Sequence, residues 1–342
     1  MKIIFLDGCG GDYTGLSLSQ QAKIGGTEVT IIHVAELLAS EHEVYVLQKT
    51  CSKACIVNNV HYAPLSDLDK LQPDALIGVR PRRMIVKVAK LFPSIPCYYW
   101  MHDIPSKRLW KYKYKFQKSH CQIISISNYQ VEVINNAWRG NLWQCFLEKL
   151  FHIKTVPINV IYNPVTDKLQ PNDETKIDNN KLIFFSAPDR GLDMILDNFF
   201  KVLEKDDSFK LYIAHPGYAS LDKYHDRLDH PNIKILGSLP NFEVIKHIRE
   251  SLCVFYPQNI KPECFGMVYA ESNALGTPVL AHDFGAAKEV LSNSGQLVDA
   301  TNSDKVVNRL LSWKQERPKV CLDAKLRSKA ALKAWNQLLN VS

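Results

Sequence analysis

The chain has 342 residues, of which 46% are hydrophobic and 23% are charged, and its formal net charge is +7. This is the composition of an ordinary globular protein, which argues against bulk disorder, and the length suffices for two domains of normal size. The charge is mild for this length: it suits an anionic ligand or an acidic surface, but it does not by itself indicate a nucleic-acid-binding protein.

The first apolar stretch, in MKIIFLDG, is only four residues long. It is too short for a signal peptide or a membrane span, and no later apolar run approaches about 18 residues. The nine cysteines are odd in number, and several lie in strand-like runs such as IPCYYW and SLCVFY, which indicates reduced, buried thiols. We therefore expect a cytoplasmic protein whose contact with membranes, where it occurs, is peripheral.

Short apolar runs alternate with helix-length periodic segments along most of the chain. In the first half the runs are 2–6, 43–48, 75–80, 96–103, 122–127 and 157–164. In the second half they are 182–191, 209–217, 232–239, 252–258, 278–285 and 295–300. This alternation predicts, in each half, a parallel sheet covered by helices. The polar, turn-rich segment 165–181 is the predicted linker.

Ligands of open parallel sheets bind outside the carboxyl ends of strands, so the segments that follow strands hold the candidate residues. Gly25 and Gly26 begin a helix, where the backbone can approach an anion and the helix dipole favours it. A loop and cap without a ligand is the alternative. In GCGGDY (8–13), Tyr13 stands where a dinucleotide fingerprint needs its third glycine, which disfavours an NAD site.

Two further candidates follow strands. His102 comes directly after YYWM, although a lone histidine is more often structural than functional. Arg190 precedes a helix, where its guanidinium could bind a phosphate through two hydrogen bonds. A cation at a helix N-terminus opposes the dipole, so a bound anion would explain this residue. The alternative is an ordinary exposed arginine.

The segment KPECFGMVYAESNALGTPVL (261–280) follows a strand and places Glu263 and Glu271 eight residues apart. It has the pattern of an amphipathic helix that begins near Gly266. Eight helical residues rise about 12 Å and return to within about 80° of the start, so the carboxylates would lie on neighbouring faces. Free amides of Gly266 and Met267 would then point at an anion between them. A solvated helix face is the alternative.

Two other patterns have simpler interpretations. The paired aspartates of DLD (67–69) resemble a metal site, but their context predicts the first turn of a helix. The run KRLWKYKYKFQKSH (107–120) is basic with interleaved aromatics. A solvated helix face is its commoner structure, and binding to nucleic acid or anionic lipid is the alternative.

Several segments together resemble a known family. Glu-x(7)-Glu within PECFGMVYAESNALGTPVLA, followed by DFGAAKEVL, resembles the signature of retaining family 4 glycosyltransferases of GT-B fold. IGGTEVTIIHVAELLASEHEVYVL, VIYNPV and SAPDRGLDMIL resemble the family's Gly-Gly loop, interdomain segment and phosphate-contacting loop. The resemblance implies an α/β protein with two Rossmann-like parallel-sheet domains that face each other across a cleft. These would be residues 1–165 and 166–325, with the helix 326–342 packed back on the first.

The resemblance also implies roles for site residues. Glu263 matches the carboxylate that holds donor-sugar hydroxyls, and Glu271 matches the one that binds the ribose. Arg190 matches the second of two cationic phosphate ligands, and His102 matches a histidine beside the donor sugar. The remaining donor-binding positions are Gly25, Gly26, Phe265, Gly266, Met267 and Val268. Phe185 stands where the family often has its first cation, so neutralisation of the diphosphate would rest on Arg190, helix dipoles and another lysine.

The implied activity is transfer of a sugar from a UDP-, GDP- or ADP-linked donor to a hydroxyl of a glycan or lipid-linked acceptor. The anomeric configuration would be retained, and no metal, cofactor or nucleic acid is expected to take part. Arg80, Arg82, Arg83 and the basic stretch 107–118 are candidates for contact with an anionic acceptor. A nucleotide-sugar epimerase, a phosphorylase, and an inactive nucleotide- or glycan-binding scaffold of the same fold are the alternatives.

Overall fold

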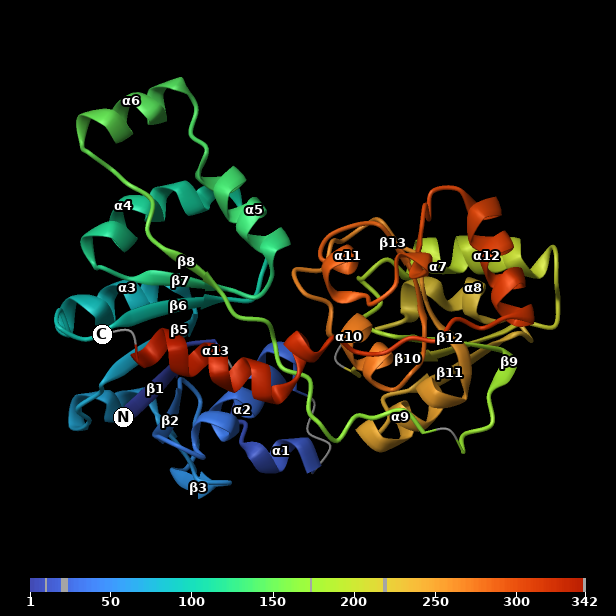
Figure 1. Cartoon of the computed structure of the whole chain (residues 1–342), viewed down its shortest axis with the longest axis horizontal. Helices are drawn as coiled ribbons and strands as arrows, with labels where there is room; N and C mark the ends of the chain where they lie inside the picture. Colours follow the sequence, from blue (N-terminus) through green and yellow to red (C-terminus); the bar gives the residue numbers. More distant parts are fainter. Residues whose placement is uncertain (10, 20–23, 173, 218–219, 341–342) are drawn as a thin grey trace. The chain divides into compact units, whose positions relative to one another are not determined.

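The computed structural model describes residues 1–9, 11–19, 24–172, 174–217 and 220–340 (Figure 1). The chain divides into two compact units: Met1–Pro164 together with Ser328–Ser342, and Val165–Arg327. Each unit has its own sheet. In the part of the chain that the structure describes, the N-terminal unit has eight strands and the C-terminal unit has six.

The sheet of the N-terminal unit has the strand order β3-β4-β2-β1-β5-β6-β7-β8. Its strands are β1 (Lys2–Asp7), β2 (Glu43–Gln48), β3 (Cys55–Val57), β4 (Val60–Pro64), β5 (Ala75–Arg80), β6 (Cys97–Met101), β7 (Gln122–Ser125) and β8 (Ile158–Val160). All neighbours are parallel except β3 and β4. Without the edge strands β3 and β8 this is the Rossmann order 3-2-1-4-5-6, which has its topological switch point between β1 and β5.

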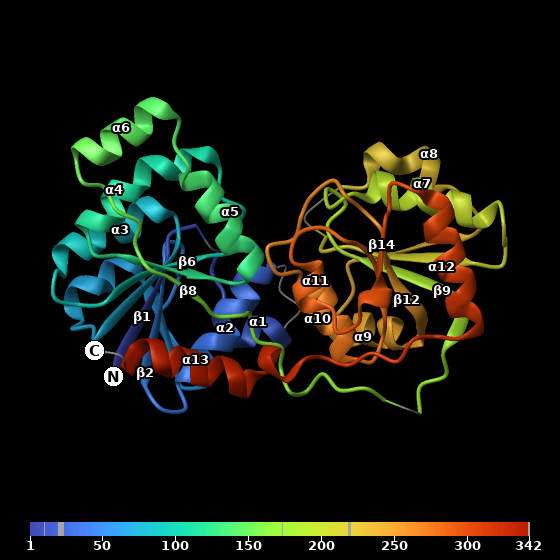
Figure 2. The same cartoon turned by 45° about the horizontal axis from the view of Figure 1, so that its top comes forward.

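Helices cover both faces of this sheet. They are α1 (Gly15–Ser19), α2 (Gly26–Leu38), α3 (Arg82–Leu91), α4 (Trp110–Lys118), α5 (Asn128–Trp138), α6 (Leu142–Leu150) and α13 (Ser328–Asn340), with the 3₁₀ segments η1 (Leu65–Lys70) and η2 (Lys107–Leu109). α2 and α13 lie on one face, and α3, α4 and α5 lie on the other (Figures 1 and 2). The C-terminal helix α13 contributes to the core: the buried ring of Trp335 lies 5.0 Å from Trp100 and 5.9 Å from Phe5.

The sheet of the C-terminal unit is entirely parallel, with the order β11-β10-β9-β12-β13-β14. Its strands are β9 (Asp178–Phe185), β10 (Lys210–Ala214), β11 (Ile233–Gly237), β12 (Ser251–Tyr256), β13 (Val279–His282) and β14 (Leu297–Val298). This is again the Rossmann order 3-2-1-4-5-6, with its switch point between β9 and β12. The six residues of β12 are all buried, as expected for a central strand that is covered on both faces.

The helices of this unit are α7 (Leu192–Leu203), α8 (His225–Leu228), α9 (Asn241–Glu250), α10 (Met267–Ala274), α11 (Ala287–Val290) and α12 (Ser303–Gln315), with η3 (Asp222–Tyr224), η4 (Ser294–Gln296) and η5 (Ala324–Leu326). α7 and α12 pack against each other on one face of the sheet, and α9 and α10 cover the other (Figures 1 and 2).

The structure corrects the expected elements in two places. The predicted linker ends earlier than expected, because residues 178–181 belong to β9. The hairpin of β3 and β4 was not predicted. Its turn is Asn58-Asn59, with φ angles of 50° and 64°, a left-handed conformation that asparagine tolerates better than most residues. Residues 67–69 lie in the 3₁₀ helix η1, which agrees with the helical turn predicted there.

None of the described helices combines the length and the hydropathy needed to cross a bilayer.

Candidate active site

The loops that follow β9 and β12 meet at the switch point of the C-terminal sheet, where open α/β sheets bind their ligands. Arg190 lies in the first loop and Glu263 in the second. Nη1 of Arg190 lies 3.4 Å from Oε2 of Glu263. The Arg190 side chain is 35% exposed and that of Glu263 is 14% exposed, so the carboxylate is the more enclosed partner. Two residues predicted separately from the sequence therefore form an ion pair.

A buried tyrosine fixes the Glu263 carboxylate. The hydroxyl of Tyr256, the last residue of β12, donates a hydrogen bond to Oε1 of Glu263 over 2.9 Å. The Tyr256 ring stacks on Phe184 and meets the edge of Tyr269. Burial, reinforced by the charge of Glu263, raises the pKa of the Tyr256 phenol well above its ordinary value, so the hydroxyl remains a donor. The strand-like context of Tyr256 gave no sequence signal for this role.

The backbone of Glu263 rests on the loop that follows β13. Ala286 donates its amide to the Glu263 carbonyl over 2.9 Å. Gly285 has φ +65°, and a Cβ there would lie 2.7 Å from that carbonyl oxygen. Only glycine permits both this conformation and this approach. The segment DFGAAKEVL therefore positions Glu263 through its backbone.

Helix α10 begins with a glycine in the left-handed region. Gly266 has φ +85°, and its carbonyl accepts hydrogen bonds from the amides of Tyr269 and Ala270. The amides of Met267 and Val268, in the first turn, have no acceptor within the helix. This helix start carries a partial positive charge, and it directly follows the loop that holds Glu263, so it suits an anion.

The helical geometry expected between Glu263 and Glu271 is wrong. Helix α10 starts only at Met267, because the left-handed conformation of Gly266 interrupts the chain before it. The helix is not amphipathic either, since most of its residues are buried. The side chain of Phe265 is buried as well, which leaves its backbone as the group available to a ligand.

Glu271 is a partly buried carboxylate without a counter-charge. Burial alone raises its pKa to about 7. Among the residues that the structure describes, none forms a hydrogen bond or ion pair with this carboxylate. A partly buried carboxylate of this kind is destabilising unless hydrogen-bond donors reach it, so the position suits a ligand that brings hydroxyl groups.

A lysine that the sequence did not single out adds a cation to the same edge. Nζ of Lys261 lies 2.6 Å from Oδ2 of Asp189, and this hydrogen bond lowers the pKa of the Asp189 carboxyl. The buried Gln258 holds the loop, because its Oε1 accepts the amides of Ile260 and Lys261. Lys261 thus places a second cation in the loops that hold Arg190 and Glu263.

At the switch point of the N-terminal sheet, Arg80 joins two carboxylates. Its Nη2 lies 3.1 Å from Oδ2 of Asp7, at the end of β1, and 2.6 Å from Oε1 of Glu28, in the first turn of α2. The hydroxyl of Tyr13 donates to Asp7 over 3.1 Å. The two carboxylates hold Arg80, one of the candidates for contact with an anionic acceptor, in place within the unit. Asp7 and Glu28 were missed in the sequence because each lies in an unremarkable strand or helix pattern.

The predicted residues of this unit lie around the same switch point. Gly25 caps α2, which starts at Gly26, and a Cβ on Gly25 would lie 2.7 Å from Oε2 of Glu28. His102 follows β6, and its ring lies 4.4 Å from that of Trp100. Its Nε2 is buried without a hydrogen-bond partner among the described residues. Burial and the charge of Arg80 lower the pKa of His102 to about 3, so the imidazole is neutral.

Within the described ranges, no group of three or more His, Cys, Asp and Glu side chains is arranged to hold a metal ion.

The start of α10 offers a direct test of the geometry around Glu263. A Cβ on Gly266 would lie 2.4 Å from the Tyr269 ring, and φ +85° disfavours any side chain. We expect Gly266→Ala to lower the free energy of unfolding by about 2 kcal/mol. Gly26→Ala is the control, because open space surrounds that position in a helix and the change should be neutral or stabilising by up to about 1 kcal/mol. Equal urea denaturation midpoints for the two variants would contradict the left-handed start of α10.

Comparison with known proteins identifies the architecture. Residues 167–332 match the family model of glycosyl transferases group 1. Sucrose-phosphate synthase from Thermosynechococcus elongatus superimposes with a TM-score of 0.66 at 11% identity, over 99% of this chain and 98% of that chain. The fold is GT-B. This confirms the predicted fold of two parallel-sheet α/β domains.

Two relatives by sequence and a further solved structure are also similar to this GT-B chain. An uncharacterized glycosyltransferase of Methanocaldococcus jannaschii is 28% identical over 156 residues, 44% of this chain and 42% of that protein. A phosphatidyl-myo-inositol mannosyltransferase of Mycobacterium leprae is 30% identical over 130 residues, 37% of this chain and 34% of that protein. The chain thus matches less than half the length of each relative. The pneumococcal O-GlcNAc transferase GtfA, in complex with UDP and GlcNAc, superimposes with a TM-score of 0.54 at 12% identity, over 78% of this chain and 57% of that chain. Both of the relatives by sequence are named as glycosyltransferases.

Proposed function

We propose that the chain is a retaining glycosyltransferase of family 4, which transfers a sugar from a nucleotide-diphosphate donor to a hydroxyl of a glycan or lipid-linked acceptor. The observation that carries the proposal is the ion pair of Arg190 and Glu263 at the switch point of the C-terminal sheet, next to the start of α10. It combines a cation and free amides for a diphosphate with a fixed carboxylate for sugar hydroxyls.

Each group has a proposed role. Arg190, Lys261 and the amides of Met267 and Val268 neutralise the donor diphosphate, as cations and helix N-termini do for other phosphates. Glu271 accepts hydrogen bonds from the ribose hydroxyls. The amide of Gly266 and the backbone of Phe265 lie in the same loop and contact the donor. The names of the neighbours support the partners: one contains UDP and GlcNAc, and one is a mannosyltransferase of a phosphatidylinositol.

Glu263 is proposed to hold hydroxyls of the donor sugar at the reaction centre. In the structure its carboxylate is already oriented by Tyr256 and Arg190, so little reorganisation is needed when the sugar binds. His102 is proposed to contact the sugar as a neutral imidazole, which follows from its low pKa. Gly25 and Gly26 are proposed to border the phosphate and the acceptor through their backbone.

In the proposed reaction, the bond between the anomeric carbon and the diphosphate oxygen breaks while the acceptor oxygen bonds to the same face of that carbon. The acceptor proton passes to the departing diphosphate oxygen, so no protein base takes part. The protein orients the two substrates and stabilises negative charge as it grows on the leaving group. Arg190 is the side chain best placed for this stabilisation, and it would exchange part of its contact with Glu263 for the diphosphate.

The test is a thermal-shift screen with UDP, GDP, ADP and their sugars, followed by transfer assays and NMR of the product anomer. We expect one nucleoside diphosphate to raise Tm more than its monophosphate does, because the cations and the α10 amides contact the second phosphate. We also expect a product with the anomeric configuration of the donor. Conversion of the donor without an acceptor would indicate an epimerase, and dependence on free phosphate would indicate a phosphorylase. Nucleotide binding without turnover on any acceptor would indicate a scaffold.

A further inference from the structure

Helix α6 presents an apolar face that the described residues do not cover. None of its residues is buried, and Leu142, Trp143, Phe146 and Leu150 are between 53% and 93% exposed. At about 100° per residue, these four side chains lie within an arc of about 100° on one side of the helix. Phe151, directly after the helix, is 61% exposed as well. So large an exposed apolar face requires an explanation.

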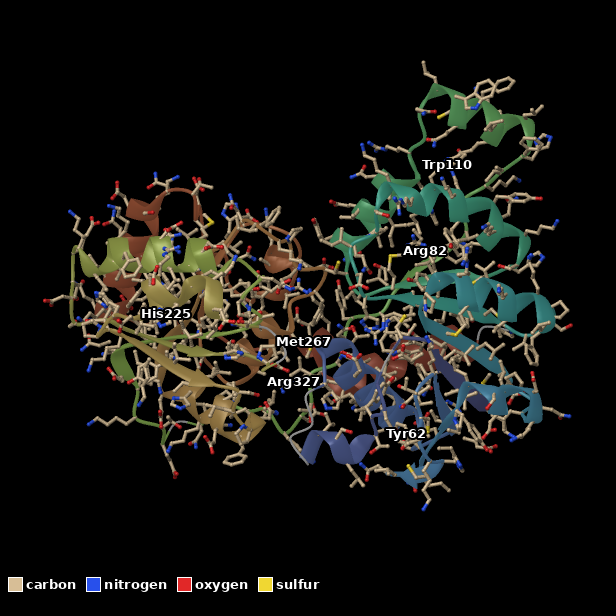
Figure 3. The ribbon with its side chains drawn as sticks, turned by 180° about the vertical axis from the view of Figure 1, so that it is seen from behind. Tyr62, Arg82, Trp110, His225, Met267 and Arg327 are labelled. Atoms are coloured by element: carbon tan, nitrogen blue, oxygen red, sulfur yellow. The ribbon has the colours of Figure 1, made fainter. Side chains whose placement is uncertain are left out.

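The opposite side of α6 is polar and held in place. Glu148 accepts a hydrogen bond of 2.6 Å from Nε1 of Trp110 and one of 2.8 Å from Nζ of Lys113, both on α4. Trp110 is labelled in Figure 3, between the two helices. Asn141 and Gln144 form a complete capping box at the start of α6. The helix is therefore well formed, with its polar side toward α4 and its apolar side exposed. Figures 1 and 2 show α6 at the edge of the unit.

The neighbouring helix α4 supplies positive charge. Lys111, Tyr114, Lys115 and Lys118 are exposed and follow the spacing i, i+3, i+4, i+7, which places them on one face. Residues 104–156 contain nine Lys and Arg but only two Asp and Glu, so this segment accounts for the whole formal charge of +7. One of those two acidic residues is the inward-facing Glu148. We call the exposed side chains of α4 and α6 named here the α4–α6 surface.

We propose that the α4–α6 surface binds an anionic lipid bilayer. Trp143, Phe146 and the two leucines would enter the boundary between headgroups and acyl chains, while the lysines of α4 meet lipid phosphates. A second copy of the chain fits less well, because a two-fold interface would bring the positive charge against itself. Nucleic acid fits less well too, since its charged backbone offers no apolar environment in which the exposed leucines could be buried. This inference goes beyond the proposed function and does not depend on it.

The test is sedimentation of the full chain with vesicles of phosphatidylcholine, with and without about 30% phosphatidylglycerol. We expect binding to the anionic vesicles that falls at least tenfold between about 0.1 and 0.5 M salt, and weak binding to pure phosphatidylcholine. The double variant Trp143→Ser, Phe146→Ser should lose at least tenfold in affinity. The triple variant Lys111→Gln, Lys115→Gln, Lys118→Gln should lose about fivefold per lysine.

Matched control variants distinguish binding through this surface from nonspecific adsorption to vesicles. Phe242, on α9, is an exposed aromatic of similar exposure, and Phe242→Ser should keep the binding of the wild type. Lys329→Gln with Lys333→Gln removes exposed lysines on α13, on the opposite face of the sheet, and should have little effect. Absence of vesicle binding, or equal binding by the Trp143–Phe146 variant, would overturn the proposal. Light scattering that shows a dimer for the wild type and a monomer for the Trp143–Phe146 variant would overturn it as well.

Discussion

Replacing Glu263 by glutamine should lower kcat for sugar transfer by at least about 100-fold, the scale on which loss of one oriented polar group acts in an active site. The amide keeps the shape and can still accept the hydrogen bond of Tyr256. It removes the negative charge that pairs with Arg190 and that, in the proposed role, would strengthen hydrogen bonds from the sugar hydroxyls. The measurement is kcat and KM for the donor found in the screen, with circular dichroism as evidence of folding. Full activity of Glu263→Gln would exclude the proposed site.

The hydroxyl of Tyr256 tests whether orientation of Glu263 matters. Tyr256→Phe keeps the buried ring but removes the hydrogen bond of 2.9 Å, so we expect kcat to fall about tenfold while KM for the donor changes little. Glu316→Gln is the matched control, an exposed glutamate of the same unit, and should retain wild-type kinetics. A rise in KM alone for Tyr256→Phe would mean that Tyr256 supports substrate binding and does not orient the carboxylate in the reaction.

The strand and helix pattern was predictable because it rests on local periodicity. Both Rossmann sheets follow from buried runs such as 252–256, which are apolar throughout since helices cover both faces. The hairpin at Asn58-Asn59 was missed because its strands are short and its turn lacks the glycine that usually marks such turns.

The site was only partly predictable, because its supporting contacts join distant segments. The pairing of Arg190 with Glu263 depends on β9 and β12 being neighbours, which sequence spacing does not show. The same holds for Lys261 with Asp189. Helical spacing misplaced Glu263 relative to Glu271, because it ignored the left-handed conformation of Gly266. Glycine in this position was visible in the sequence, but its φ angle was not.

Glu271 makes the stability of the chain depend on pH in a direction opposite to that of most carboxylates. Its pKa rises from 4.5 to about 7 on folding, so between these values the folded state binds more protons than the unfolded state. The free energy of unfolding therefore falls as pH rises through this window. Glu271→Gln should remove the cost of burying the ionised carboxylate. The free energy of unfolding of the variant minus that of the wild type should therefore be about 2–3 kcal/mol higher at pH 8 than at pH 5. Urea denaturation at the two pH values measures the difference, and equal differences at both would refute the raised pKa.

Protonation of the Glu271 carboxyl should also change the affinity for the donor. In the proposed site, ribose hydroxyls would donate to the ionised form of Glu271. With a pKa of about 7, the ionised fraction of this carboxyl rises about tenfold between pH 6 and pH 8. The affinity for a nucleotide sugar, whose phosphates do not titrate in this range, should therefore rise by about the same factor. Titration calorimetry at the two pH values tests this, with Glu271→Gln as the control whose weaker affinity should be independent of pH. A wild-type affinity that does not change with pH would leave Glu271 as a partly buried carboxylate without a role in binding the ribose, whatever the activity of the chain.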